Sequence, residues 1–395
     1  MRTGLLIGLI ATLIGAGLPA GLDAQARTAP AERRLDRPDA AYPEPFSLLT
    51  GLRELPDGRV LVSDGIDQTL LWLNLATGRT TSLGRTGQGP GEYRSPDALF
   101  PMPGGATLLV DLGNGRLSLY GADGQYRESM SIAQGTPGPG AGPGGLRLIL
   151  PRAVDNRGRL YFQQPGGIGS GGVPADSQAV LRFDRSSSVV DTVAFVKVAP
   201  PAVRTTGTAN NQNVRMMPRP FPASDGWAVA PDGRLAIVRA ADYRVEWVTP
   251  TGRSRGQPVT VRPVPIRDAE RREWAASVGG GLSISMENRN GEVTTNFRRG
   301  RPGAQEPDLS GVEWPSHKPA FVSANVFATP EGDVWVERSM AAGAPREYDV
   351  FDRQGNLSGR VILQRDRRVV AFGAGTVYVV RSDEDDLQYL ERYRR

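Results

Sequence analysis

Few side chains in this chain have the chemistry of a familiar catalytic or metal centre. His317 is the only histidine and there is no cysteine. Histidine or thiolate metal clusters, Ser–His–Asp catalysis and a cysteine nucleophile are therefore excluded. No Gly-Lys-Ser/Thr sequence is present, which excludes a phosphate-binding loop of that type. His317 stands in a proline-rich segment, and we interpret it as a surface or packing residue. Carboxylates, amides and arginines remain as ligand-binding groups.

The candidate groups recur at one position, the end of an apolar segment that follows a Gly turn. Asp64 and Asp111 end the first two such segments, and Asp67 and Asn114 follow them by three residues. The later copies end in Gln163, Arg239, Arg338 and Arg381. A ring that mixes Asp or Asn with Arg suits an anionic or sugar-like ligand, and its oxygen atoms alone suit Ca²⁺ or Mg²⁺. In the structural alternative, each Asp accepts backbone N–H groups of its own turn or pairs with an Arg.

These positions belong to a strand–turn–strand phrase that occurs six times. Two copies are LRELPDGRVLVSD at Leu52–Asp64 and WAVAPDGRLAIVR at Trp227–Arg239. The turns of the six copies lie near Gly58, Gly105, Gly158, Gly233, Gly332 and Gly375. A third strand with alternating apolar residues follows each copy, and a tight turn toward a fourth strand follows five of them. The recurrence predicts an all-β, six-bladed β-propeller of four-stranded antiparallel blades.

The sixth repeat reaches Arg395 after its third strand. We therefore expect the outer strand of blade 6 to come from the N-terminal part of the chain, within Arg34–Ser47. Such closure removes exposed sheet edges. We treat residues 27–395 as one propeller domain.

The long segments between strands all fall at equivalent places in the blades. With the four strands of each blade lettered A to D in chain order, they are B–C loops or connections from one blade to the next, whereas the A–B and C–D turns are tight. In an up-and-down blade these two groups lie on opposite faces, so the insertions are predicted on one face: 133–150, 164–178, 199–222, 261–315 and 339–346. The largest insertion, 261–315 between blades 4 and 5, is predicted to contain a helix at Arg267–Ser277 and a hairpin within Leu282–Phe297. Insertions restricted to one face commonly mark a binding face.

Three segments carry a resemblance to a known family. LLVDLGNGRLSLYGADG at Leu108–Gly124 resembles the NHL repeat, and GRTGQGPGEYRSP at Gly84–Pro96 is similar to a Gly-Pro-Gly-Glu-aromatic linker of exported bacterial six-bladed propellers. EWPSHKPAF at Glu313–Phe321 is also similar to that group. The resemblance implies the same fold and an exported protein. In this linker we expect Glu92 to pair with Arg85 or Arg94.

The N-terminal residues are typical of a signal peptide, and we expect residues 1–26 to be removed. A basic Arg2, an apolar Gly4–Leu18 and the small-residue site Ala24-Gln25-Ala26 support this interpretation. The absence of cysteine excludes a lipidated N-terminal cysteine, so we expect a periplasmic or secreted protein that is not a lipoprotein. No later segment reaches membrane-spanning length. The net charge of +5 is spread along the chain, and the sequence does not favour nucleic-acid binding.

Two functions of different classes follow from these observations. The first is an exported, non-catalytic binding propeller, expected as a monomer, that uses its insertion-bearing face and channel mouth for a protein, small-molecule or carbohydrate ligand, with no cofactor. The alternative is a Ca²⁺- or Mg²⁺-dependent hydrolase of lactonase type with oxygen ligands at the channel. Arginines at the other strand ends weaken the alternative, because cations repel a metal ion. A third hypothesis is a structural partner in an envelope complex that recognises a protein segment.

Overall fold

The computed structural model describes residues 30–134, 147–164, 176–200, 202–208, 211–217, 219–278, 282–289, 292–300, 309 and 312–395. The predicted signal peptide lies outside these residues, and so do parts of four predicted insertions: 135–146; 165–175; 201, 209–210 and 218; and 279–281, 290–291, 301–308 and 310–311. Among the described residues, no helix is both long and apolar enough to cross a bilayer.

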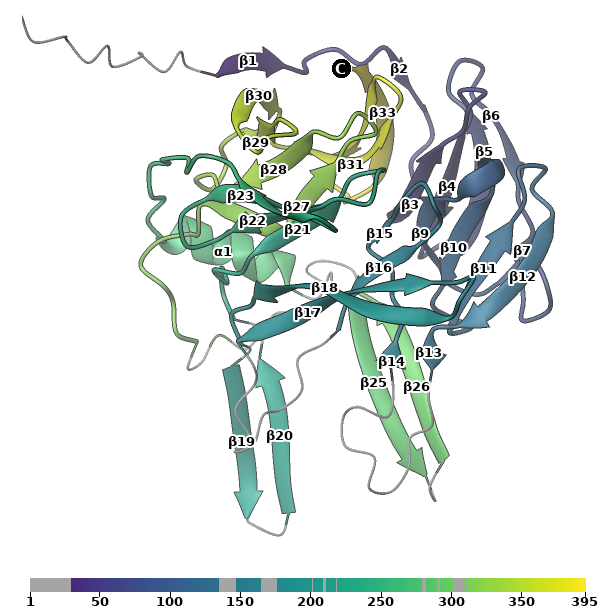
Figure 1. Ribbon diagram of the computed structural model, residues 1–395, viewed down its shortest axis with the longest axis horizontal. Helices are drawn as coiled ribbons and strands as arrows, with labels where there is room; N and C mark the ends of the chain where they lie inside the picture. Colours follow the sequence, from purple (N-terminus) through teal and green to yellow (C-terminus); the bar gives the residue numbers. More distant parts are fainter. Residues whose placement is uncertain are drawn as a thin grey trace, which may run out of the picture.

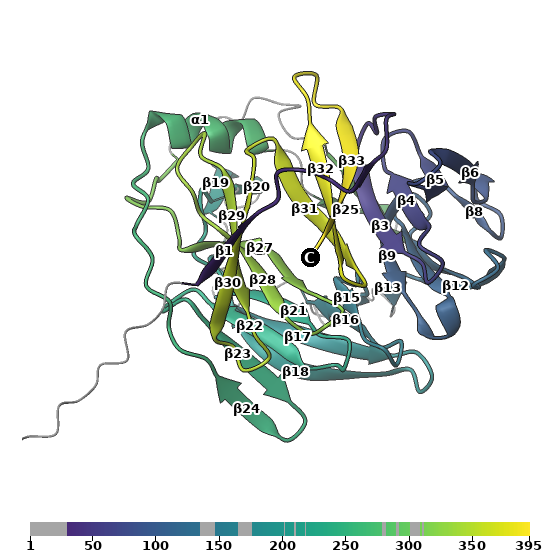
Figure 2. The same ribbon diagram turned by 90° about the horizontal axis from the view of Figure 1, so that it is seen from above.

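Six small antiparallel sheets surround one axis and form a six-bladed β-propeller, as predicted (Figure 2). Blades 1 to 3 contain β3 (Leu49–Glu54), β4 (Val60–Asp64), β5 (Thr69–Asn74) and β6 (Arg79–Ser82); β9 (Pro96–Pro101), β10 (Thr107–Asp111), β11 (Arg116–Tyr120) and β12 (Tyr126–Ser131); and β15 (Ala153–Val154), β16 (Leu160–Gln163), β17 (Ser177–Asp184) and β18 (Val189–Lys197). Blades 4 to 6 contain β21 (Gly226–Val229), β22 (Leu235–Arg239), β23 (Arg244–Thr249) and β24 (Gly252–Arg255); β27 (Phe321–Ala328), β28 (Val334–Arg338), β29 (Arg346–Phe351) and β30 (Leu357–Leu363); and β31 (Arg367–Gly373), β32 (Thr376–Ser382) and β33 (Gln388–Arg394). The six A–B turn glycines have positive φ, from 66° at Gly375 to 91° at Gly332, a conformation that favours glycine.

The N-terminal part of the chain completes blade 6, which confirms the predicted closure. The short strand β2 (Ala40–Ala41) pairs antiparallel with β33 as the fourth strand of this blade. The backbone N–H of Asp39 and of Tyr42 donate to carbonyls of β33 over 2.9 Å. An additional strand, β1 (Ala31–Arg34), pairs in parallel with β30, so blade 5 has five strands rather than the four expected. The N-terminal segment therefore joins blades 5 and 6.

All described parts of the long insertions lie on one face of the propeller, as the strand positions predicted. Below the blades in Figure 1 lie the hairpin strands β13 (Ala133–Gln134), β14 (Arg147–Leu148), β19 (Ala202–Thr208), β20 (Asn211–Met217), β25 (Leu282–Arg289) and β26 (Glu292–Arg299). The helix α1 (Asp268–Ser277) and the β25–β26 hairpin confirm the two elements predicted within the largest insertion. The side-chain carboxylate of Glu270 in α1 accepts a hydrogen bond from the backbone N–H of Ala342, which lies in the B–C loop of blade 5. We call this side the insertion-bearing face.

The hydrophobic core lies between neighbouring blades rather than inside any one sheet. All five residues of β4 and of β10 are buried, because another blade covers each face of these strands. One cluster joins Leu61 of blade 1 to Leu109 and Tyr120 of blade 2. Burial on both faces explains the continuous apolar runs of the central strands. The packing of each blade against the next holds the ends of the inner strands in place around the axis.

Candidate functional site

Asp64 uses its carboxylate to brace the backbone where the last blade meets the first. It is 1% exposed. Its Oδ2 accepts the N–H of Ser47 over 2.7 Å and of Leu48 over 3.1 Å. Its Oδ1 accepts the N–H of Ile66 over 2.9 Å and of Asp67 over 3.0 Å. These four bonds join the chain entering blade 1 to its B–C loop, and Asp67 itself is exposed there.

Asp111 makes the equivalent brace in blade 2. Its Oδ1 accepts the backbone N–H groups of Arg94 and Ser95 over 3.1 and 3.2 Å, and that of Asn114 over 3.4 Å. Its Oδ2 accepts the side-chain amide of Asn114 over 2.7 Å, and Nε of Arg116 lies 3.6 Å away. Both predicted aspartates are therefore held by bonds within the protein. Ligand binding by Asp64, Asp67, Asp111 or Asn114 stays a prediction.

Blade 4 has the same brace with the carboxylate on the other chain segment. Asp225, just before β21, accepts the N–H of Lys197 over 3.0 Å and of Ala240 over 2.9 Å. The predicted site residue Arg239 donates from Nη1 to Asp225 over 2.8 Å and from Nε to Glu246 over 2.5 Å. Arg239 is therefore shared between two buried carboxylates, and its guanidinium has an internal role.

Glu246 lies between two arginines of blade 4. Its side chain is 3% exposed, and Nε of Arg255 donates to it over 2.5 Å from the side opposite Arg239. Burial alone would raise the pKa of this carboxyl, but the hydrogen bonds and charges of Arg239 and Arg255 outweigh burial and hold the pKa below its ordinary value of 4.5. Glu246 is thus an ionised carboxylate on β23 that lies between arginines of the two neighbouring strands. We call this arrangement a carboxylate sandwich.

Blades 5 and 6 repeat this sandwich around the other two predicted arginines. In blade 5, Arg338 pairs with Glu347, and the fully buried Asp349 lies 3.7 Å from Nε of Arg338 and 2.9 Å from Nε of Arg360. In blade 6, the carboxylate of Glu391 lies 3.4 Å from Nε of Arg381 and 2.8 Å from Nε of Arg367. The three arginines expected at the mouth are therefore paired with carboxylates of their own blades.

Two other arginines at the insertion-bearing end of the inner strands have no such pairing with any described residue. Arg152 precedes β15 and Arg368 lies in β31, and these innermost strands belong to blades 3 and 6, which stand opposite each other across the axis (Figure 2). Burial by surrounding protein lowers the pKa of both guanidinium groups. Arg152 is nevertheless exposed and Arg368 partly exposed. We call the insertion-bearing end of the inner strands, where these two arginines lie, the channel mouth.

The contacts of Arg152 and Arg368 are with neutral groups. Nη1 of Arg152 donates to the side chain of Gln163 over 3.3 Å, and its guanidinium lies 4.7 Å from the ring centroid of Trp227. Nη2 of Arg368 donates to the side chain of Gln388 over 3.3 Å. Within the part of the chain that the structure describes, neither guanidinium forms an ion pair with a carboxylate.

Two further arginines increase the positive charge at the channel mouth. Arg346 donates to Glu337 over 2.6 Å, and Arg299 of the inserted β25–β26 hairpin donates to Asp97 of β9 over 2.5 and 2.8 Å. Burial is the main cause of the lowered pKa of Arg368. Tyr348 and Glu337 act in the opposite direction, and the positive charges of Arg346 and Arg299 lower the pKa. Arg346 and Arg299 thus bring two further guanidinium groups near the channel mouth, each of them paired with a carboxylate.

The sequence analysis did not predict Arg152 and Arg368, because it considered the end of the second strand of each blade and not the start of the first strand. Arg152 lies six residues before Gly158, and Arg368 lies seven residues before Gly375. Since the first strand of each blade is the one nearest the axis, a count back from each Gly turn identifies these positions. Arg299 carried no comparable signal, because a long insertion brings it to β9.

The described residues contain no group of three His, Cys, Asp or Glu side chains placed to hold a metal ion. Asp64 and Asp111, which the lactonase alternative requires, are separately engaged with backbone N–H groups. The polar atoms at the channel mouth are mainly guanidinium and amide groups. This donor set suits an anion and not a hard cation.

Comparisons with known proteins give distant likenesses only. No family model matches the chain, and no curated protein does. A gluconolactonase from Xanthomonas campestris has a TM-score of 0.41 at 13% identity, and the match covers 90% of this chain and 92% of that one. Virginiamycin B lyase from Staphylococcus aureus has 0.37 at 11%, covering 90% and 98%. Regucalcin, a calcium-binding protein from Agrobacterium tumefaciens, has 0.33 at 13%, covering 91% and 95%. These likenesses carry no argument about activity, and the predicted NHL-like and exported character stays a prediction.

Proposed function

We propose that this chain is a non-catalytic binding propeller that takes a small organic dianion at the channel mouth. The observation that carries the proposal is the pair Arg152 and Arg368. Both guanidinium groups are surrounded by protein, still reach solvent, and lack a carboxylate partner in the described residues. Both charges are therefore available to a ligand of opposite charge, and a guanidinium group suits a carboxylate.

The proposed ligand carries two separated negative groups, one for each guanidinium, because Arg152 and Arg368 belong to opposite blades. Arg346 and Arg299 add positive potential from the flanks. The neutral partners Gln163 and Gln388 hold the two guanidinium groups in place without neutralising them.

The test is isothermal titration of the purified full chain with succinate at low ionic strength, with neutral succinamide as the matched control ligand. We expect succinate to bind and succinamide not to bind. Arg152→Gln and Arg368→Gln should each weaken succinate binding about tenfold, the loss of one charge-assisted pair. Arg79→Gln, on the exposed outer strand β6 of blade 1, should bind as wild type. Absence of succinate binding, or unchanged binding by both mouth variants, would overturn the proposal.

The metal-dependent hydrolase alternative gives a different result in the same protein. It requires stoichiometric Ca²⁺ or Mg²⁺, a rise in melting temperature when either ion is added, and loss of both on Asp64→Ala or Asp111→Ala. The binding proposal predicts none of these metal effects. A metal-content measurement with a thermal-shift titration therefore distinguishes the two functions.

We also propose that the protein acts outside the cytoplasm, on the basis of the signal-peptide pattern before Arg27. Mass spectrometry of the protein from cell fractions should find a chain that begins at Arg27 in the periplasm or medium. An intact chain confined to the cytoplasm would contradict this.

A further inference from the structure

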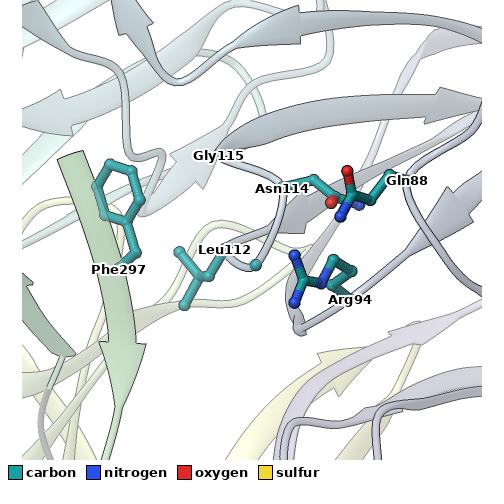
Figure 3. Close-up of a pocket in the computed structure, with 7 residues that line it drawn as sticks. Gln88, Arg94, Leu112, Asn114, Gly115 and Phe297 are labelled. Atoms are coloured by element: carbon teal, nitrogen blue, oxygen red, sulfur yellow. The ribbon is translucent and has the colours of Figure 1, made fainter. Parts of the chain in front are cut away.

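A second site is built on the insertion-bearing face, between blade 2 and the inserted hairpin. A cavity of about 310 Å³ opens there. It is lined by Gln88, Arg94, Leu112, Gly113, Asn114, Gly115 and Phe297. Figure 3 shows Phe297 on one side of Leu112 and Arg94 on the other, with Gln88 and Asn114 side by side. None of these residues belongs to the channel mouth described above.

One wall of the cavity is the linker between blades 1 and 2, and internal bonds hold it rigid. Arg116 donates to the backbone carbonyls of Gln88 and Gly89 over 3.1 and 2.8 Å. Glu92 accepts the N–H of Gly89 over 2.8 Å and pairs with Arg85 over 2.7 Å, as the sequence predicted for Glu92. A Cβ atom at Gly87 would lie 2.1 Å from Glu92 Oε2. The linker is therefore shaped before any ligand arrives, which lowers the cost of binding.

The opposite wall is Phe297 of β26, which the Arg299–Asp97 pair holds against blade 2. The two residues of β26 are two positions apart, so both side chains project from the same side of the strand. Phe297 lies close to the B–C loop, since its Cε2 would be 3.9 Å from a Cβ atom at Gly115. The bidentate pair, at 2.5 and 2.8 Å, thus holds the strand that carries Phe297 beside the cavity.

Three polar groups line the cavity, and within the described residues each has hydrogen-bonding capacity that no protein group takes up; Arg94 and Gln88 are exposed to solvent. The guanidinium of Arg94 and the side-chain amide of Gln88 take part in no hydrogen bond there, and Asn114 uses only its amide NH₂ as a side-chain group, toward Gly87 and Asp111. This leaves a cationic donor, an amide and an acceptor oxygen around one space. A carboxylate satisfies Arg94, and a hydroxyl group can donate to the Asn114 oxygen.

We propose that this cavity binds a hydroxy-substituted aromatic carboxylate of single-ring size. Its carboxylate would bind Arg94, its hydroxyl group would bind Asn114 and Gln88, and its ring would pack on Phe297. Aromatic rings gain from edge or offset packing beyond the area they bury. The cavity volume is at the lower end for small-molecule sites, which matches a ligand of one ring. The site is independent of the channel-mouth proposal.

The test is isothermal titration of the full chain with 4-hydroxybenzoate. We expect binding to weaken about tenfold with benzoate, which lacks the hydroxyl group, and to be lost with 4-hydroxybenzamide, which lacks the charge. Arg94→Gln should weaken 4-hydroxybenzoate binding about tenfold, and Phe297→Ala should weaken it severalfold. Circular dichroism of each variant should match the wild type.

Two controls keep this site apart from the channel mouth. Arg79→Gln and Arg152→Gln should bind 4-hydroxybenzoate as wild type does, whereas Arg152→Gln weakens succinate binding. Absence of 4-hydroxybenzoate binding, or binding that Arg94→Gln leaves unchanged, would overturn the inference. Loss of 4-hydroxybenzoate binding on Arg152→Gln alone would place the ligand at the channel mouth. Glucuronate is a hydroxylated carboxylate without an aromatic ring, and its binding as tightly as 4-hydroxybenzoate would contradict the proposed role of the ring.

Discussion

The buried carboxylates at strand ends bind backbone N–H groups rather than leaving their oxygens free. Asp64, Asp111 and Asp225 each join the chain that enters a blade to the B–C loop of that blade. In blade 4 the carboxylate comes from the entering segment, and in blades 1 and 2 it comes from the strand end. The same place in each of these three blades is thus braced by a carboxylate, but the residue that supplies it comes from a different part of the repeat in blade 4.

We predict that Asp64→Asn destabilises the protein by about 2 kcal/mol, because an amide NH₂ would replace one of the two acceptor oxygens that now serve four N–H groups. Urea denaturation followed by circular dichroism measures the loss. Asp67→Asn, three residues away and exposed, is the matched control and should be neutral. Equal stability of the two variants would show that the brace contributes little.

At the scale of elements, the N-terminal segment and the inserted hairpin both act at a distance from their place in the sequence. The N-terminal segment supplies β2 to blade 6 and adds β1 to blade 5. Between β2 and blade 1, Phe46 is 4% exposed and exchanges two backbone hydrogen bonds with Gln388, over 2.7 and 2.9 Å. The hairpin supplies Phe297 and Arg299 to blade 2. Closure and site formation therefore depend on segments that no local pattern assigns to a blade.

Two N-terminal truncations test the closure. A chain that begins at Leu35 loses only the exposed β1 and should keep a melting temperature close to that of the chain beginning at Arg27. A chain that begins at Leu48 also loses β2 and Phe46, and burial of Phe46 alone is worth about 3 kcal/mol or more. We expect its melting temperature to fall by several degrees. Similar stability of both truncations would contradict closure by this segment.

Over the whole molecule, positive charge is used in two ways. Within blades 4 to 6, arginines sandwich buried carboxylates and tie strands together. At the channel mouth, Arg152 and Arg368 have no carboxylate partner in the described residues. The first use stabilises the ring of blades, and the second leaves a potential for an anionic ligand. A net charge of +5 alone does not distinguish these uses.

Glu246 makes stability depend on pH in the acid range. The pKa of Glu246 is held below its ordinary 4.5 in the folded state, so its contribution is present above pH 4.5 and is lost as pH falls through the lowered folded pKa. We expect the free energy of unfolding to be flat near pH 6 to 7 and to decrease below about pH 4.5. Glu246→Gln should be less stable than wild type at pH 7, and the difference should shrink toward pH 3. A difference that stays constant over this range, in urea denaturation, would contradict the assignment.

The fold was predictable from the sequence because its information is local and repeated. Each Gly turn between apolar strands specifies one hairpin, and the position of the long segments between strands specifies the face on which they lie. The segment within Arg34–Ser47 that closes blade 6 followed from the missing strand. The predicted helix in the largest insertion is α1, and the predicted hairpin is β25–β26.

The candidate site was predictable only as a region, the insertion-bearing face and channel mouth. The strand-end residues Arg239, Arg338 and Arg381 point to that region, but whether a charge is paired depends on which side chains lie opposite, across strands that are far apart in the chain. Only the tertiary structure shows that these three arginines meet carboxylates while Arg152 and Arg368 do not. Local patterns thus determined the blades and their two faces. The closure of the ring, which brings distant residues together, decided which of these arginines are paired with carboxylates.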